Sequence, residues 1–150
     1  MCDMFDLDNF LPYKLSILSQ AVSGLVAREY ESKFGLTMNQ WRCLVIIQAH
    51  QPITARNIVP LTLLDKMAIS RAVNALQKRS LIFSSKGKDA RSRMLSLTKT
   101  GQEIYDQVIP IAQENESRLL KSLTPEQQLS LQDIMDKLMR ETRELSTEKQ

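Results

Sequence analysis

Most of the architecture follows from residues 66–101, which read KMAISRAVNALQKRSLIFSSKGKDARSRMLSLTKTG. The first part has the i, i+3, i+4, i+7 spacing of a helix that buries one side, through Ile69, Ala72, Val73 and Leu76. Two short apolar-rich runs, 81–83 and 94–97, then enclose a polar segment with a glycine. They predict two strands joined by a loop over 84–93. Thr98 starts a further helix, so the predicted order is helix, β-hairpin, helix.

The predicted helix has a polar face opposite its apolar stripe, made of Ser70, Arg71, Asn74, Gln77 and Lys78. Arginine can pair with guanine and asparagine with adenine, while serine and lysine mostly contact the phosphate backbone. The face therefore fits the major groove of DNA. By itself, the same pattern is equally typical of an amphipathic helix whose polar side faces only water.

The predicted hairpin loop carries four cations, Lys86, Lys88, Arg91 and Arg93. These cations repel one another unless an anion lies against them, and the phosphates of a nucleic-acid groove would supply that anion. We expect Arg91 to reach deepest, because a narrow minor groove attracts guanidinium groups. Asp89 is expected to pair with Arg91 and orient it. The alternative is a charged turn in contact with water.

The charge of the chain is unevenly distributed. Its 150 residues, 43% hydrophobic and 25% charged, are typical of one folded domain, and the net charge is +3. Residues 66–93 hold eight Lys or Arg and one Asp, a net charge of +7, so the rest of the chain carries −4. A strongly basic face on a slightly acidic body indicates a nucleic-acid surface rather than a generally basic protein.

Further helices are predicted on both sides of this unit. We expect helices over 11–33, 38–50 and 55–61 before it, the second after an N-cap at Thr37, and two more after it that start at Thr98 and at Thr124. Thr124 is followed by a proline and then, three positions after the threonine, by a glutamine, which is a strong helix start.

The predicted fold class is mainly α with a small β-hairpin wing: a winged helix-turn-helix over 36–97 within a single domain over 1–150. The helices in 1–34 and 98–150 do not belong to a minimal winged helix, and their apolar sides need a surface to cover. We therefore expect them to be the dimerisation helices of a homodimer. Its two recognition helices would lie about 34 Å apart and read a palindrome. The alternative is a monomer whose terminal helices pack on its own winged helix.

Three segments make the chain resemble a known family. Segment 89–101, DARSRMLSLTKTG, is similar to the wing-to-helix signature of the MarR family of winged helix-turn-helix regulators. Segment 36–44, LTMNQWRCL, resembles the helix that leads into the DNA-binding unit, and 10–16, FLPYKLS, resembles the first-helix opening of one branch. The resemblance covers nearly the whole chain and implies a dimeric, DNA-binding regulator. The chain departs from the family at Ser80, where a glycine is common.

The resemblance also implies a small-molecule effector. Ligands of the family, often aromatic acids, bind between the dimer helices and the winged helix and change the spacing of the recognition helices. Tyr13, Ser16, Trp41 and Arg42 lie on the matching segments and would supply stacking and anion-binding groups. Trp41 is alternatively a core anchor, and Arg42 alternatively a member of a structural salt bridge.

The predicted function is a sequence-specific regulator of transcription that binds double-stranded DNA, a dimeric repressor that a small aromatic or anionic ligand releases from a palindromic operator. The alternative is a winged-helix protein-interaction adaptor that binds an acidic partner through the same basic face. The expected DNA contacts are Thr54, Lys66, Ser70, Arg71, Asn74, Lys78, Lys86, Lys88, Arg91 and Arg93.

Enzymatic chemistry has little basis in this sequence. His50, Cys2 and Cys43 form no metal-ligand or nucleophile pattern, so we expect no enzyme, no cofactor and no metal. Cys43 lies in an apolar run and is expected to be a small buried side chain rather than a redox group. No stretch approaches the roughly 18 apolar residues of a membrane span, and the start is acidic. We therefore expect no membrane partner and a cytoplasmic location.

Overall fold

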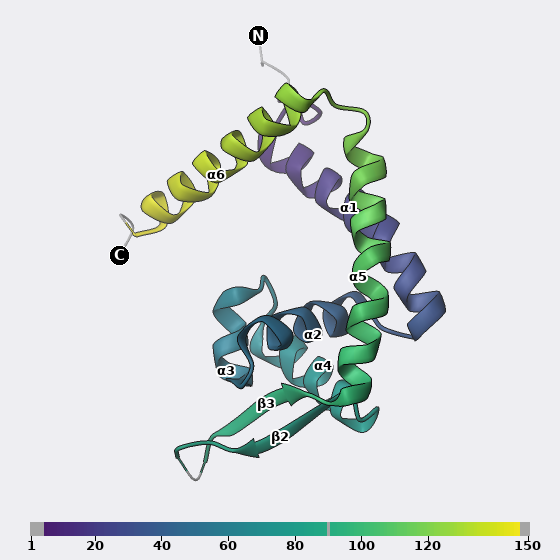
Figure 1. Cartoon of the computed structure of the whole chain (residues 1–150). Helices are drawn as coiled ribbons and strands as arrows, with labels where there is room; N and C mark the ends of the chain where they lie inside the picture. The colour runs from purple at the N-terminus through teal and green to yellow at the C-terminus, as the bar shows by residue number, and fades with distance from the viewer. Residues whose placement is uncertain (1–4, 90, 148–150) are drawn as a thin grey trace. The chain divides into compact units, whose positions relative to one another are not determined.

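The computed structural model describes residues 5–89 and 91–147 (Figure 1). The chain forms two compact units, Met1–Ala112 and Gln113–Gln150. The helices are α1 (Leu11–Phe34), α2 (Met38–His50), α3 (Ala55–Ile58), a 3₁₀ turn (Val59–Leu61), α4 (Lys66–Lys78), α5 (Lys99–Leu120) and α6 (Pro125–Thr147). The strands are β1 (Ile53–Thr54), β2 (Ile82–Lys86) and β3 (Arg93–Leu97). Among the described residues, no helix combines the length and apolarity that crossing a bilayer requires.

The helices before the hairpin begin and end close to their predicted positions because local caps fix them. The Thr37 hydroxyl accepts a hydrogen bond from the N–H of Gln40, and the Gln40 side chain accepts one from the N–H of Thr37, each at 3.3 Å. Asp65 caps α4 by accepting from the N–H of Ala68 at 2.7 Å. At the end of α1, Gly35 has a φ of 61°, in the left-handed region that glycine adopts without strain.

The β-sheet contains one strand more than the sequence predicted. Its strands are antiparallel in the order β1-β3-β2, and the two-residue strand β1 pairs Ile53 with Leu95. The hairpin strands are also longer than expected, since residues 84–86 and Arg93 are paired strand residues and the loop is shorter than the predicted 84–93. The apolar pattern ends before the pairing does, because the ladder of backbone hydrogen bonds needs no apolar side chain.

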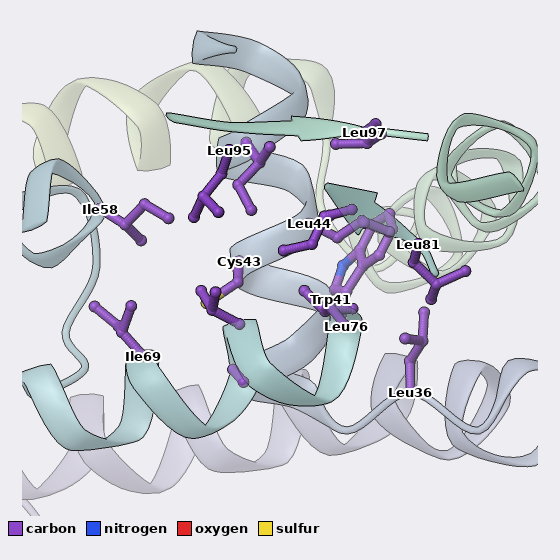
Figure 2. Close-up of a cluster of buried hydrophobic side chains, with 14 of the residues drawn as sticks. Leu36, Trp41, Cys43, Leu44, Ile58, Ile69, Leu76, Leu81, Leu95 and Leu97 are labelled. Carbon is purple, nitrogen blue, oxygen red and sulfur yellow. The ribbon is translucent and has the colours of Figure 1, made fainter. Parts of the chain in front are cut away.

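The hydrophobic core of the first unit gathers side chains from α2, α3, α4 and the sheet (Figure 2). The predicted stripe of α4 is buried: Ile69, Ala72, Val73 and Leu76. Cys43 has no exposed surface, and burial raises the pKa of its thiol to about 11. The prediction of a small buried side chain at Cys43 is confirmed, and a protonated thiol is a poor nucleophile. Cys2 lies outside the described residues.

Three aromatic rings join α1 and α5 to α2 within the first unit. The ring centroid of Trp41 lies 5.8 Å from that of Tyr30 in α1 and 5.9 Å from that of Tyr105 in α5. Trp41 and Tyr30 are both buried. Contacts at these distances stabilise aromatic pairs beyond the area that they bury. The interpretation of Trp41 as a core anchor is therefore confirmed.

The turn between α4 and β2 holds the start of α5. Ser80 has a φ of 55°, so a serine occupies the left-handed position that glycine commonly fills. The Ser80 carbonyl oxygen accepts from the Thr98 hydroxyl at 2.7 Å, and the N–H of Thr98 donates to the Leu81 carbonyl oxygen at 3.0 Å. A Cβ atom on Gly101 would overlap the Leu81 carbonyl oxygen. The close approach of α5 to this turn thus requires glycine at position 101.

The second unit contains the end of α5 and all of α6. The Thr124 hydroxyl accepts from the N–H of Gln127 at 3.2 Å, and the Gln127 side chain accepts from the N–H of Thr124 at 2.9 Å. This capping box confirms the helix start predicted at Thr124. No described residue of α6 is buried. Its exposed apolar side consists of Leu131, Ile134, Met135 and Leu138.

Candidate nucleic-acid interface

Helix α4 presents one polar side to solvent. Burial of the opposite side in the core fixes the orientation of the helix about its axis. Ser70 and Asn74 lie about one turn apart on the exposed side, and Arg71 and Lys78 lie about two turns apart beside them. Every residue predicted to contact DNA from this helix is exposed: Lys66, Ser70, Arg71, Asn74 and Lys78.

A groove of about 780 Å³ lies between α3, α4 and the hairpin. Its polar lining comes from Arg56 of α3, from Lys66, Ser70, Asn74 and Gln77 of α4, and from Ser84 and Arg93 of the strands. This lining contains three cations and no carboxylate. A concave surface of one charge focuses the electric field and attracts polyanions. Arg71 and Lys78 are exposed on α4 beside the groove rather than within its lining.

The wing formed by β2 and β3 extends away from α2 and α4 (Figure 1) and carries its predicted cations on one ribbon. Lys86 lies directly opposite Arg93 in the antiparallel pair, and Lys88 and Arg91 are exposed at the tip. Like charges at directly opposite positions are destabilising. A polyanion against this ribbon would remove that repulsion.

The wing tip is shaped by Asp89 through the backbone. The Asp89 carbonyl oxygen accepts from the N–H of Ser92 at 3.0 Å and from the Ser92 hydroxyl at 2.9 Å. The Asp89 carboxylate accepts from the backbone N–H of Arg91 at 3.4 Å. Asp89 therefore contacts Arg91 through the backbone N–H, and within the described residues no ion pair joins the two side chains. A carboxylate two residues before an N–H in a turn reaches that N–H more easily than the end of the longer side chain.

The start of α3 brings a further cation to the groove. The Thr54 hydroxyl accepts from the N–H of Asn57 at 3.2 Å and so caps α3. Thr54 is absent from the groove lining, whereas Arg56 is part of it. Arg56 is not among the contacts predicted from the sequence. Its place in the first turn of a capped helix just before α4 is the signal that would have pointed to it.

The four residues expected at a ligand site fall into two places. Trp41 and Arg42 line a shallow cavity of about 350 Å³, with apolar side chains of α2 and of the segment before α4. Tyr13 and Ser16 are exposed near the start of α1. Tyr30 is the α1 residue that contacts Trp41, and at 1.5 Å per residue Tyr13 lies about 25 Å further along the helix. A single chain therefore does not bring the four residues together.

The side chains of Tyr30 and His50 lie in different environments, one buried and one exposed. Burial raises the pKa of Tyr30, and the nearby charge of Arg42 opposes the rise. His50 is exposed in the last turn of α2. In the part of the chain that the structure describes, no three His, Cys, Asp or Glu side chains are grouped to hold a metal ion.

Comparisons with known proteins agree with this geometry. Residues 36–92 match the model of the MarR family. An HTH-type transcriptional regulator of Bacillus cereus is 26% identical over 117 residues, which cover 77% of this chain and 78% of the relative. A MarR/EmrR family transcriptional regulator from Acinetobacter sp. ADP1 has a TM-score of 0.83 and 25% identity, covering 93% of this chain and 99% of its own. A MarR-family structure from Listeria monocytogenes complexed with a 26-mer DNA has a TM-score of 0.80 and 23% identity, covering 89% of each chain. The predicted fold class is confirmed.

Proposed function

We propose that this chain, of which residues 36–92 match the model of the MarR family, is a transcriptional regulator of that family that binds double-stranded DNA sequence-specifically, as a homodimeric repressor. The observation that carries the proposal is the basic groove between α4 and the wing. An α-helix fits the major groove of B-DNA, and a charged hairpin beside it can reach the adjacent minor groove. The side chains exposed on α4 and on the wing are of the types that commonly contact bases and phosphates.

The proposed contacts divide by chemistry. Arg71 and Asn74 read base edges in the major groove, because their side chains form paired hydrogen bonds with guanine and adenine. Arg91 enters the minor groove from the wing tip. Phosphate contacts, which set affinity rather than specificity, come from Lys66, Ser70, Lys78, Lys86, Lys88 and Arg93. Thr54, whose hydroxyl accepts the capping hydrogen bond from Asn57 and keeps its own proton to donate to a phosphate, remains a proposed contact, and Arg56 of α3 is added to it.

A DNA-bound protein of the same fold supports the proposal. The Listeria monocytogenes structure, which superimposes on 89% of this chain, contains a 26-mer DNA. At 23% identity the likeness supports a shared fold.

The dimer is supported by apolar side chains that the single chain leaves in contact with water. In the first unit, Leu11, Leu15, Leu18 and Leu25 of α1 are about half exposed. In the second unit, α6 exposes a full apolar side. Two helical faces of this kind in one chain are typical of a surface that a partner covers. We propose that the partner is a second copy, so that two recognition helices read a palindrome.

A small aromatic or anionic effector is the remaining part of the proposal. Trp41 and Arg42 border a cavity, although the burial of Trp41 leaves little of its ring for a ligand. Tyr13 and Ser16 would join such a site only from the second copy, because they lie too far along α1 in the same chain. Release of the operator would then follow from a change in recognition-helix spacing.

Selection of binding sites from a random duplex library at near-physiological salt tests the proposal. We expect a palindrome with half-sites about one helical turn apart. If each half supplies about four phosphate contacts, log affinity should fall with log salt with a slope near −7. Recovery of no motif, with only salt-sensitive bulk binding, would favour the adaptor that binds an acidic partner.

Two substitutions separate base reading from backbone binding. Asn74→Ala should cost about 1–3 kcal/mol on the selected operator and relax the preference at one base position. Arg91→Ala should weaken binding to all sequences and reduce the salt slope. Lys121→Ala, which removes an exposed cation between α5 and α6, outside this interface and outside the proposed dimer faces, is the matched control and should leave both quantities unchanged.

A further inference from the structure

One cation of the basic segment 66–93 contacts the protein itself. The guanidinium of Arg79 donates to the carbonyl oxygen of Gly35 through Nη1 at 2.9 Å and to that of Phe34 through Nη2 at 2.6 Å. These acceptors lie 44 and 45 residues earlier in the chain, at the end of α1. Arg79 thus joins the end of α4 to the end of α1 within the first unit.

The acceptors suit a guanidinium group. The last carbonyl groups of a helix have no partner within it, and they carry the negative end of the helix dipole. The left-handed conformation of Gly35 turns the chain at this point, and the two neighbouring carbonyl oxygens receive two N–H groups of one planar fork. A lysine would retain the charge but not the fork.

The position of Arg79 on α4 separates it from the proposed DNA contacts. It follows Ser70 by nine residues, about two and a half turns, so it lies on the opposite side of the helix. Lys78, one residue earlier, is exposed on the polar side. Arg79 therefore contacts α1, whereas Lys78 faces the proposed DNA-binding side.

The residue after Arg79 continues the same junction. The Ser80 carbonyl oxygen accepts from the hydroxyl of Thr98, the residue that precedes α5. The two residues that follow α4 are thereby hydrogen-bonded to the end of α1 and to the residue before α5. The C-terminal end of the recognition helix α4 is therefore held by α1, which precedes the winged helix, and by α5, which follows it.

We infer that Arg79 is a positioning residue, which sets the orientation of the recognition helix α4 relative to α1 and makes no contact with DNA. This inference rests on the proposed function. Since α1 belongs to the proposed dimer surface, the Arg79 fork fixes where each recognition helix stands relative to the two-fold axis. Loss of the Arg79 fork lets α4 pivot about its buried side. The protein then tolerates operators whose half-sites have the wrong spacing.

The test compares Arg79→Ala, Arg79→Lys and the control Lys78→Ala in the full-length protein. Each variant is titrated with the palindrome selected by the wild type, and with versions one base pair shorter and longer, over a series of salt concentrations. We expect both Arg79 variants to lose about tenfold in affinity for the natural spacing. Their preference over the altered spacings should shrink, and their salt slope should stay at the wild-type value. Lys78→Ala should keep the spacing preference and lose about 1.8 from the slope, one phosphate contact per half.

A second measurement does not depend on DNA. Hydrogen exchange of the Gly35 and Leu36 amides, which donate to carbonyl oxygens of α1 and close its end, should speed up in Arg79→Lys relative to Lys78→Ala. Thermal unfolding shows whether each variant is folded. If Arg79→Ala does not fold, the comparison of Arg79→Lys with the wild type carries the test.

Several outcomes would overturn the inference. A slope reduced by about 1.8 in Arg79→Ala and restored in Arg79→Lys would make Arg79 a phosphate contact. Unchanged affinity, spacing preference and amide exchange would show that the fork has no positioning effect. If the wild type selects no palindrome, the proposed function itself fails. That outcome is distinct, because the amide exchange still reports whether Arg79 holds the end of α1.

Discussion

Two neighbouring side chains at the end of α4 illustrate how position decides the role of a charge. Lys78 is exposed on the polar side, where a cation has only solvent and an approaching anion to interact with. Arg79 donates to two carbonyl oxygens of the same chain. Because the roughly 100° rotation per residue of a helix separates them, the charge of this segment overstates the charge that faces DNA.

The thiol of Cys43 provides a pH-dependent test of the core. Its folded-state pKa of about 11 lies above the ordinary 9.0, because burial disfavours the thiolate. The folded protein therefore holds this proton more tightly than the unfolded chain. The corresponding stability is present in full below pH 9 and is lost as the pH rises to about 11, a change of about 3 kcal/mol.

Urea unfolding of the wild type and of Cys43→Ala at pH 8 and pH 10.5 measures this effect. The variant is expected to be less stable at pH 8, because it loses buried volume, but to lose less further stability at high pH. The two proteins differ only at residue 43, so the contributions of all other groups cancel in the comparison. Equal losses in the two proteins would show that the thiol is accessible to water in the folded state.

At the scale of elements, the junction of α4, β2 and α5 is the most constrained part of the winged helix. Ser80 stands in a left-handed conformation, and Gly101 is in close contact with the Leu81 carbonyl oxygen. Thr98 links the two by hydrogen bonds to both Ser80 and the N–H of Gly101. The angle at which the wing leaves α4 is set here.

Substitutions at this junction should change stability in opposite directions. Gly101→Ala should lower the free energy of unfolding by about 2–3 kcal/mol, because the added Cβ meets backbone that cannot move aside. Ser80→Gly should raise it by about 0.5–1 kcal/mol, because glycine adopts a positive φ without strain. Chemical denaturation measures both. A neutral Gly101→Ala would mean that α5 can shift away from Leu81 at little cost.

At the scale of the whole molecule, α1 and α6 each leave an apolar side exposed in the single chain. Leu18 of α1 is 57% exposed in the single chain, and Ile134 of α6 is 53% exposed. Both lie on helices outside the DNA-binding unit. The proposed dimer would remove these side chains from water and would pair the two recognition helices at the same time.

Leu18→Glu tests the dimer surface. A charge buried in an apolar interface should weaken dimerisation at least about 100-fold and abolish preference for the palindrome over a half-site. Leu63→Glu is the matched control, because Leu63 is 99% exposed in the segment before α4 and its replacement should leave the dimer intact. Analytical ultracentrifugation measures both variants. A monomeric wild type, or equal effects of the two substitutions, would contradict the proposed dimer.

The sequence by itself determined the features that depend on near neighbours in the chain. The caps at Thr37 and Thr124 join residues three positions apart, so their residue types alone located the helix starts. The buried stripe of α4 and the cations of the wing follow from spacing along one element. These features were sufficient for the fold class and for the position of the proposed DNA-binding face.

The tertiary structure alone decided which distant segments meet. Strand β1 is too short to show a pattern of its own and exists through the pairing of Ile53 with Leu95. The partner of Arg79 lies 44 residues away, and Arg56 joins the groove only through the packing of α3 beside α4. The distance between Tyr13 and Trp41 likewise depends on the straight course of α1. Contacts between segments far apart in the chain depend on how whole elements pack, and residue type and local spacing do not contain that information.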